Sequence, residues 1–139
     1  MSAAPRSDAA GFPVRPGEEP WTTAELKQVR AELEAEAEGL RADIAKAARD
    51  IAEGLSGSVR DAGDDEADAG TKASEREHEL ALSQNAQDLL DQGERALDRI
   101  DAGTYGVCES CGQPIGKARL LAFPRATLCV ACKQRQERR

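Results

Sequence analysis

The sequence predicts a mainly α-helical protein: a long antiparallel helical hairpin (coiled coil), a small C-terminal four-cysteine zinc finger and a disordered N-terminal arm. Three observations predict this fold class. Four cysteines form two Cys-x-x-Cys pairs, two long segments carry apolar residues at helical spacing, and 32% of the residues are charged while only 3% are aromatic. Alanine supplies 25 of the 139 residues, and it favours helices while burying little surface. Long solvated helices are therefore expected in place of a large globular core.

The N-terminal segment, residues 1–20, is expected to form no regular structure. It holds four of the six prolines of the chain, and proline lacks the backbone N–H that helices and sheets use. Gly11 and Gly17 add backbone freedom. We therefore expect a disordered arm.

A helix is predicted to begin directly after this arm. Thr22 and Glu25 have the spacing of a capping box, in which each side chain accepts a hydrogen bond from the other residue's backbone N–H. Trp21 and Leu26 occupy the positions of a hydrophobic staple around it. Apolar residues then recur at helical spacing up to a segment rich in glycine and serine. The helix is predicted over 22–55, a length of about 50 Å.

A second helix is predicted from near Thr71 or Ser74 to residue 102, where Gly103 supplies the stop. Its expected apolar seam consists of His78, Leu82, Ala86, Leu89, Leu97 and Ile100. Neither helix is expected to be stable alone on so narrow a stripe, so residues 21–102 should pair as an antiparallel hairpin. The same stripe could also pair between chains, and the sequence leaves the oligomeric state open.

The segment that joins the two helices, residues 61–70, contains five acidic residues and no basic one. One interpretation is structural, because carboxylates at the start of a helix interact favourably with its dipole and with solvent. The other is functional: a narrow rod with an acidic tip could deliver carboxylates into a deep electropositive or metal-containing cavity of a partner. The residues themselves leave both interpretations open.

The four cysteines, Cys108, Cys111, Cys129 and Cys132, predict one structural zinc site. Each Cys-x-x-Cys turn can direct two thiolates at one ion, and seventeen residues separate the pairs. Four thiolates fill the tetrahedral coordination sphere of Zn²⁺, so the ion is expected to fold a module over 103–139 and not to catalyse a reaction. Two disulfides are the alternative. The lack of a secretory signal in this sequence argues against them.

Charge is distributed unevenly along the chain. The net charge is −7, yet the segment from Cys108 onward holds seven Lys or Arg against two Glu, which is +5 and leaves −12 for the remainder. A mainly acidic surface repels nucleic-acid phosphates, so direct DNA binding is not expected. The basic tail either contacts an acidic partner or nucleic acid, or only solubilises the chain. No apolar run is long enough to span a membrane, and a cytoplasmic location is expected.

Together these features resemble the DksA/TraR family of bacterial transcription regulators with a four-cysteine zinc finger. The closest likeness lies in Tyr-Gly-Val-Cys-Glu-Ser-Cys-Gly-Gln-Pro-Ile-Gly from Tyr105 and Arg-Leu-Leu-Ala-Phe-Pro-Arg-Ala-Thr-Leu-Cys-Val-Ala-Cys-Lys from Arg119. The resemblance implies a non-enzymatic regulator that binds RNA polymerase and inserts its hairpin through the secondary channel toward the active-site Mg²⁺. The family's tip motif, Asp-x-x-Asp-x-Ala, matches Asp65, Asp68 and Gly70 here, so the resemblance makes the two aspartates the functional tip.

The chain also departs from the family pattern. Gly70 replaces the alanine of the tip motif, which removes a methyl group and loosens the backbone. The basic positions that serve ppGpp binding in the family correspond to Gln92, Phe123 and Lys133, of which only Lys133 is basic. This speaks against a response to that alarmone. Lys133 and Arg119 are candidate effector or partner contacts.

Two other functions stay open from the residues alone. A small binding module could contact nucleic acid or a protein through the zinc finger and the basic C-terminal end, with the helices as a spacer or a dimerisation element. A thiol redox switch that ejects zinc on oxidation is the third possibility. The sequence gives no exposed cysteine of low pKa that would favour it.

Overall fold

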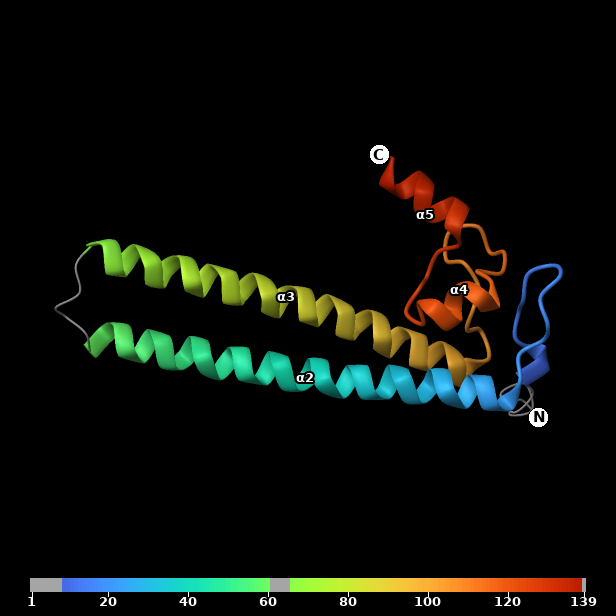
Figure 1. Ribbon diagram of the computed structural model, residues 1–139, viewed down its shortest axis with the longest axis horizontal. Helices are drawn as coiled ribbons and strands as arrows, with labels where there is room; N and C mark the ends of the chain where they lie inside the picture. Colours follow the sequence, from blue (N-terminus) through green and yellow to red (C-terminus); the bar gives the residue numbers. More distant parts are fainter. Residues whose placement is uncertain (1–8, 61–65, 139) are drawn as a thin grey trace. The chain divides into compact units, whose positions relative to one another are not determined.

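The structure is a computed structural model that describes residues 9–60 and 66–138, and the side chains in 55–69 are outside that description. Its elements are η1 (Ala9–Gly11), α2 (Thr23–Arg60), α3 (Glu66–Ala102), α4 (Lys117–Ala122) and α5 (Val130–Glu137). The predicted fold class is confirmed: the described chain is mainly helical, and α2 and α3 pair as a hairpin (Figure 1). Within the described ranges, no helix has the length and apolar character needed to cross a membrane.

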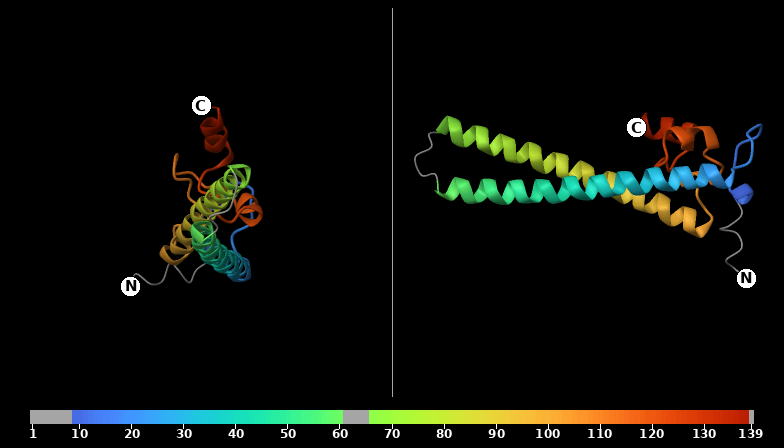
Figure 2. Two further views of the ribbon diagram at one scale, coloured as in Figure 1. Left: turned by 90° about the vertical axis from the view of Figure 1, so that its left-hand side faces the viewer. Right: turned by 60° about the horizontal axis from the view of Figure 1, so that its bottom comes forward.

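The chain divides into two compact units. The first unit comprises Met1–Ala37 with Gln92–Arg139, and the second comprises Glu38–Asp91. Both contain parts of α2 and α3. In the first unit, α4 and α5 follow the C-terminal end of α3, and the N-terminal segment precedes α2 (Figure 2).

The start of α2 has the local structure that the sequence predicts. The backbone N–H of Glu25 donates to Oγ1 of Thr22 at 3.1 Å, and the N–H of Thr22 donates to Oε1 of Glu25 at 3.0 Å. Trp21 and Leu26 are 2% and 9% exposed, so the staple is buried as well. The capping box therefore satisfies two backbone donors that the first turn of a helix leaves free.

Both long helices extend further than predicted. The structure continues α2 to Arg60, through the glycines and serines that were expected to end it at residue 55. It begins α3 at Glu66 instead of near Thr71 or Ser74. Glycine inside a helix costs only about 1 kcal/mol relative to alanine, so isolated glycines weaken a long helix without ending it. The end of α3 is as predicted, because Gly103 adopts a φ of +82° and Thr104 N–H bonds the carbonyl of Arg99 at 2.9 Å.

The predicted seam of α3 is correct in its C-terminal half and wrong nearer its start. Ile100 is buried, but His78 and Leu82 are exposed, with Leu82 56% exposed. The positions seven and fourteen residues before the buried Leu90 are Ser83 and Arg76, and both are half-buried. The half-buried residues of α3 in the second unit include Arg76, Glu79, Ser83 and Ala86. In the second unit, this register leaves two leucines of α3 exposed, Leu80 and Leu82.

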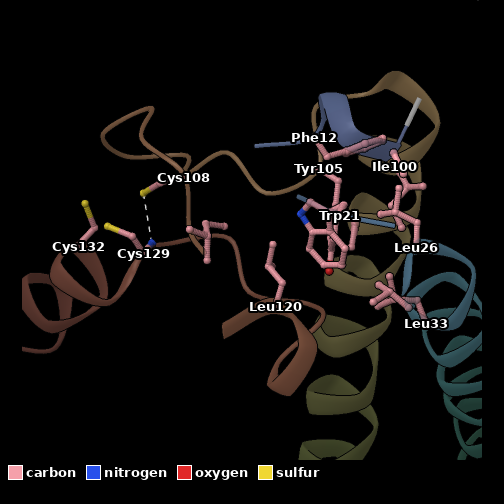
Figure 3. Close-up of a cluster of buried hydrophobic side chains, with 14 residues drawn as sticks. Phe12, Trp21, Leu26, Leu33, Ile100, Tyr105, Cys108, Leu120, Cys129 and Cys132 are labelled. Carbon is pink, nitrogen blue, oxygen red and sulfur yellow. Dashed lines mark hydrogen bonds between the residues drawn. The ribbon is translucent and has the colours of Figure 1, made fainter. Parts of the chain in front are cut away.

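The hydrophobic core of the first unit joins the start of α2, the end of α3 and the cysteine-rich segment (Figure 3). The rings of Trp21 and Tyr105 lie with centroids 6.0 Å apart and tilted by 57°. Leu33 and Leu120 pack in the same cluster and are 1% and 0% exposed. The Tyr105 hydroxyl donates to the carbonyl of Pro124 at 2.9 Å, so this polar group has a partner inside the core.

For residues 9–20 the structure differs from the disordered arm that the sequence predicts. Ala9 and Phe12 are 7% and 3% exposed and belong to the core cluster. The indole N–H of Trp21 donates to the carbonyl of Pro13 at 3.3 Å. Proline and glycine disfavour long helices and strands, and the segment holds only the short 3-10 helix η1, but they do not prevent irregular backbone from packing against an apolar surface. Residues 1–8 of the predicted arm lie outside the description.

Candidate metal centre

The four cysteines converge on one point. Their Sγ atoms all lie within 4.8 Å of one another, and Cys111 and Cys129 have an Sγ–Sγ distance of 3.9 Å. Four sulfurs around one tetrahedral Zn²⁺, at Zn–S distances of about 2.3 Å, are about 3.8 Å apart. Cys111 is exposed, and the other three are buried at 2–4% exposure. The geometry fits a single ion with four sulfur ligands.

The first cysteine pair is positioned by a tight turn. An isolated antiparallel bridge joins Val107 and Pro114, and Cys108 N–H donates to the carbonyl of Gln113 at 2.9 Å. Gly112 closes the turn, because its N–H bonds the carbonyl of Cys108 at 3.0 Å and its φ is +76°. A residue with a side chain rarely adopts that φ, so the glycine that follows the second cysteine is required by the turn.

The second cysteine pair is positioned by a helix start. Cys129 is the N-cap residue of α5, with extended backbone at φ −70° and ψ 168°, and Cys132 lies in the first turn. The backbone N–H of Cys129 donates to Sγ of Cys108 at 3.4 Å, which links the two pairs directly (Figure 3). The N-cap geometry turns both sulfurs of this pair toward the first.

The backbone favours thiolates at this centre. Burial raises the pKa of the Cys108 thiol, but hydrogen bonds from the backbone N–H groups of Cys111, Cys129 and Ser110 outweigh it and lower the pKa to about 6. A backbone hydrogen bond from Cys132 similarly lowers the pKa of Cys129. Cys111 is the opposite case: a backbone hydrogen bond lowers its pKa, but burial and the neighbouring cysteines raise it to about 11. Closely spaced thiols resist full deprotonation, and a divalent cation removes that repulsion.

The cofactor of this chain is one structural Zn²⁺, held by these four cysteines. An all-sulfur tetrahedral donor set is typical of Zn²⁺ that folds a small module. Four protein ligands leave no position for water or substrate, so the ion supplies no Lewis-acid chemistry. Its contribution is to folding, because the thiolates come together only when the chain is folded.

Three contacts that the sequence analysis missed support the centre. Arg99 forms an ion pair with Glu109, which lies between the first two cysteines, and thereby connects that turn to α3. The backbone N–H of Glu109 donates to the carbonyl of Thr127 at 2.9 Å. Arg135 Nη2 donates to Sγ of Cys132 at 3.0 Å. Only the last has a sequence signal, because a residue three positions after a helical cysteine lies on the same face of the helix.

The candidate effector or partner contacts meet at one groove of the first unit. Its volume is about 930 Å³, and Gln92, Arg119, Phe123 and Lys133 are among the residues that line it. Both basic candidates have a partner: Lys133 lies 3.9 Å from a carboxylate oxygen of Glu137, and Arg119 Nε donates to the carbonyl of Leu128 at 3.2 Å. The Arg119 guanidinium also lies 5.7 Å from the centroid of the Phe123 ring. Phe123 is 61% exposed, so the groove has an apolar wall where the family pattern has a basic residue.

The structure does not test the predicted functional tip. Asp65 lies outside the described residues. Asp68 lies in the first turn of α3, but its side chain is among those left outside the description. The structure therefore places the second aspartate on a helix and leaves the role of both as a prediction.

Comparison with known proteins identifies relatives of this chain. Residues 103–138 match the family described as prokaryotic dksA/traR C4-type zinc finger. The RNA polymerase-binding transcription factor DksA of Escherichia coli (strain K12) is 31% identical over 119 residues, which cover 86% of this chain and 76% of that protein. The factor of the same name from Caulobacter vibrioides is 41% identical over 75 residues, but the match spans only 53% of its length.

A solved structure is similar over most of the chain. Transcription factor DksA2 from Pseudomonas aeruginosa has a TM-score of 0.66 and 34% sequence identity to this chain. The match covers 84% of this chain and 85% of that structure, so it includes the hairpin as well as the cysteine-rich segment. The matched region therefore extends well beyond the zinc finger.

Proposed function

The chain belongs to the DksA/TraR family of C4-type zinc finger proteins, and from this premise we propose that it is a transcription regulator that binds RNA polymerase. The observation that carries the proposal is the match to a polymerase-binding factor over 76% of that factor's length. A zinc finger alone would support only a binding module. A relative matched along both the hairpin and the finger supports a shared mode of action.

In the proposed mechanism the hairpin enters the secondary channel of the polymerase and brings Asp65 and Asp68 toward the active-site Mg²⁺. The two aspartates stand at the distance from the cysteines that the family motif has. Carboxylates near a metal ion alter its local electrostatics without any catalytic step of their own. The zinc finger and the core of the first unit then serve to hold the two helices. We propose no enzymatic activity and a cytoplasmic location beside the polymerase.

The same proposal excludes ppGpp as a required co-effector. Of the three positions that match the family's basic set, Gln92 and Phe123 carry no positive charge, and Lys133 has Glu137 as a neighbour. Two of these three positions therefore offer a polyanion no positive charge. We propose that any effect on transcription is independent of this alarmone.

The test replaces the tip charges and measures binding and initiation separately. In the double variant Asp65→Asn/Asp68→Asn, binding to purified RNA polymerase should persist, because the helices and the finger are unchanged. The effect on initiation complexes should be at least tenfold smaller than that of the unsubstituted protein. Binding is measured by pull-down with competition by another secondary-channel protein, and initiation by transcription in vitro with and without ppGpp.

A matched control is available on α2. Glu38→Gln/Asp43→Asn removes the same charge from two exposed positions away from the tip and should leave initiation activity as in the unsubstituted protein. Normal regulation by the tip variant would refute the tip mechanism. Absence of polymerase binding by the unsubstituted protein would refute the proposed function altogether.

The alternative is a module that binds nucleic acid or a protein partner through its basic C-terminal end. Two of the basic residues concerned already have partners, since Lys133 lies near Glu137 and Arg135 donates to Cys132. Fewer free charges are then left to neutralise phosphates. Binding of the full chain to duplex DNA with a steep salt dependence, and no binding to polymerase, would favour this alternative.

A further inference from the structure

Arg135 belongs to the basic C-terminal tail, whose role the sequence alone leaves open, and it contacts a sulfur of the metal centre. Its Nη2 lies 3.0 Å from Sγ of Cys132. Both residues belong to α5 and are three positions apart, so they share a helix face. Cys132 is buried at 4% exposure, whereas Arg135 is exposed. A guanidinium is permanently charged, so this is a charge-assisted hydrogen bond to a thiolate.

Cys132 differs from the other three cysteines in its hydrogen-bond donors. Cys108, Cys111 and Cys129 accept hydrogen bonds from backbone N–H groups of the turns around them. Cys132 lies inside α5, where the following backbone donors are used by the helix; the N–H of Lys133, for example, bonds the carbonyl of Cys129 at 2.9 Å. For Cys132, the donor that the described structure shows is the Arg135 side chain.

The net negative charge of the zinc centre means that a hydrogen-bond donor to one of its sulfurs is stabilising. Four thiolates carry more negative charge than one Zn²⁺ neutralises, and three of the sulfurs are removed from bulk water. A hydrogen bond to a metal-bound sulfur withdraws electron density from it and offsets the excess charge. Partners that contact ligands in this way commonly change metal affinity by about 10–100-fold.

We propose that Arg135 is a positioning residue of the zinc centre: it stabilises the Cys132 thiolate, fixes its orientation and slows the release of zinc. The contact is local to one turn of α5 and does not depend on the tip of the hairpin. The proposal concerns zinc retention alone and is independent of the proposed role in transcription.

The test compares three variants of the full-length zinc-loaded protein. Arg135→Gln removes the charge, and Arg135→Lys keeps the charge with a single ammonium donor. Arg138→Gln removes the same charge from the C-cap of the same helix and serves as the control for net charge. Zinc transfer to the chromogenic chelator 4-(2-pyridylazo)resorcinol is followed by absorbance. Far-UV circular dichroism checks that each variant is folded.

We expect zinc transfer to be about tenfold faster in Arg135→Gln than in the unsubstituted protein, unchanged in Arg138→Gln and intermediate in Arg135→Lys. Equal rates in Arg135→Gln and Arg138→Gln would overturn the proposal, because the effect would then be one of net charge. If Arg135→Gln failed to fold, Arg135→Lys would decide: a rate faster than that of the unsubstituted protein by less than tenfold supports the proposal, and an unchanged rate or a greater acceleration overturns it.

A spectroscopic readout separates a contact to sulfur from a general loss of stability. With Co²⁺ in place of zinc, the sulfur-to-metal charge-transfer band reports the electron density on the thiolates. Loss of the hydrogen bond in Arg135→Gln should move this band to lower energy, whereas Arg138→Gln should leave it in place. A band that stays unchanged in Arg135→Gln would refute a direct contact.

Discussion

At the scale of single residues, Glu18 shows how one carboxylate can anchor irregular backbone. It accepts hydrogen bonds from the backbone N–H groups of Lys117 at 2.9 Å, Ala118 at 3.0 Å and Arg15 at 2.7 Å. Two of these donors belong to the first turn of α4, where helix geometry leaves N–H groups without partners. Burial raises the pKa of Glu18, but the hydrogen bonds from Ala118, Arg15 and Lys117 outweigh it, so the pKa lies below its usual 4.5.

This shift predicts a pH-dependent contribution of Glu18 to stability. A carboxylate whose pKa is lower in the folded protein stabilises the fold above its unfolded pKa, and the contribution is lost as the pH falls through the folded value. Glu18→Gln should therefore be less stable than the unsubstituted protein at pH 7. The difference should shrink as the pH falls below 4.5.

Urea unfolding of both proteins across this pH range measures the difference, and metal analysis at each pH restricts the comparison to samples that retain zinc. Glu19→Gln is the matched control, because its exposed side chain lies one position away. A difference between Glu18→Gln and the unsubstituted protein that does not change with pH would show that the carboxylate charge is not responsible.

At the scale of elements, α3 begins earlier than its sequence suggests and includes Gly70. A Cβ added at Gly70 would meet nothing within 4 Å, and the same holds for Gly54 near the end of α2. Neither glycine is required by a close contact. Each therefore weakens its helix through backbone entropy. Of these two glycines, only Gly70 occupies a position of the family's tip motif.

Replacing Gly70 by alanine should stabilise the start of α3 by about 1 kcal/mol, because alanine is the better helix former. The variant also restores the alanine of the family motif, so we expect a stronger effect on initiation than that of the unsubstituted protein. Helicity by circular dichroism and transcription in vitro are the two measurements. Gly54→Ala is the matched control.

The control variant Gly54→Ala should raise helicity by about as much as Gly70→Ala does and leave the effect on initiation unchanged. An equal gain in initiation activity for both variants would indicate that helix stability, and not the tip motif, governs the effect. A loss of helicity in Gly70→Ala would contradict its place inside α3.

At the scale of the whole molecule, we expect the core of the first unit to depend on the metal. Its cluster includes buried side chains from α2 and α3 and from the segments around the cysteines, with three of the cysteines themselves as members. Trp21 is the only tryptophan of the chain and is 2% exposed in this cluster. It therefore reports on the first unit in particular.

Removal of zinc by a chelator should expose Trp21 and shift its fluorescence emission to longer wavelength, because the module around the cysteines lacks an apolar core of its own. Circular dichroism should fall as α4 and α5 unfold. Metal analysis confirms that zinc is absent, and added zinc should restore both signals. An emission maximum that does not move in the zinc-free protein would show that the core forms without the metal.

The sequence by itself determined the local features of this protein. Cysteine spacing predicts the zinc ligands, and Thr22 with Glu25 predicts the start of α2, because both depend on residues a few positions apart. Gly103 predicts the end of α3 for the same reason. The family resemblance also rests on such short-range patterns.

Tertiary structure decided what depends on distant partners. Phe12 and Glu18 lie in a segment whose composition suggests disorder, and they are ordered by contacts with residues about 100 positions away. The exposure of Leu82 follows from the register of α3, which its apolar pattern alone does not specify. Burial and long-range hydrogen bonds are properties of the folded chain, and no local pattern encodes them.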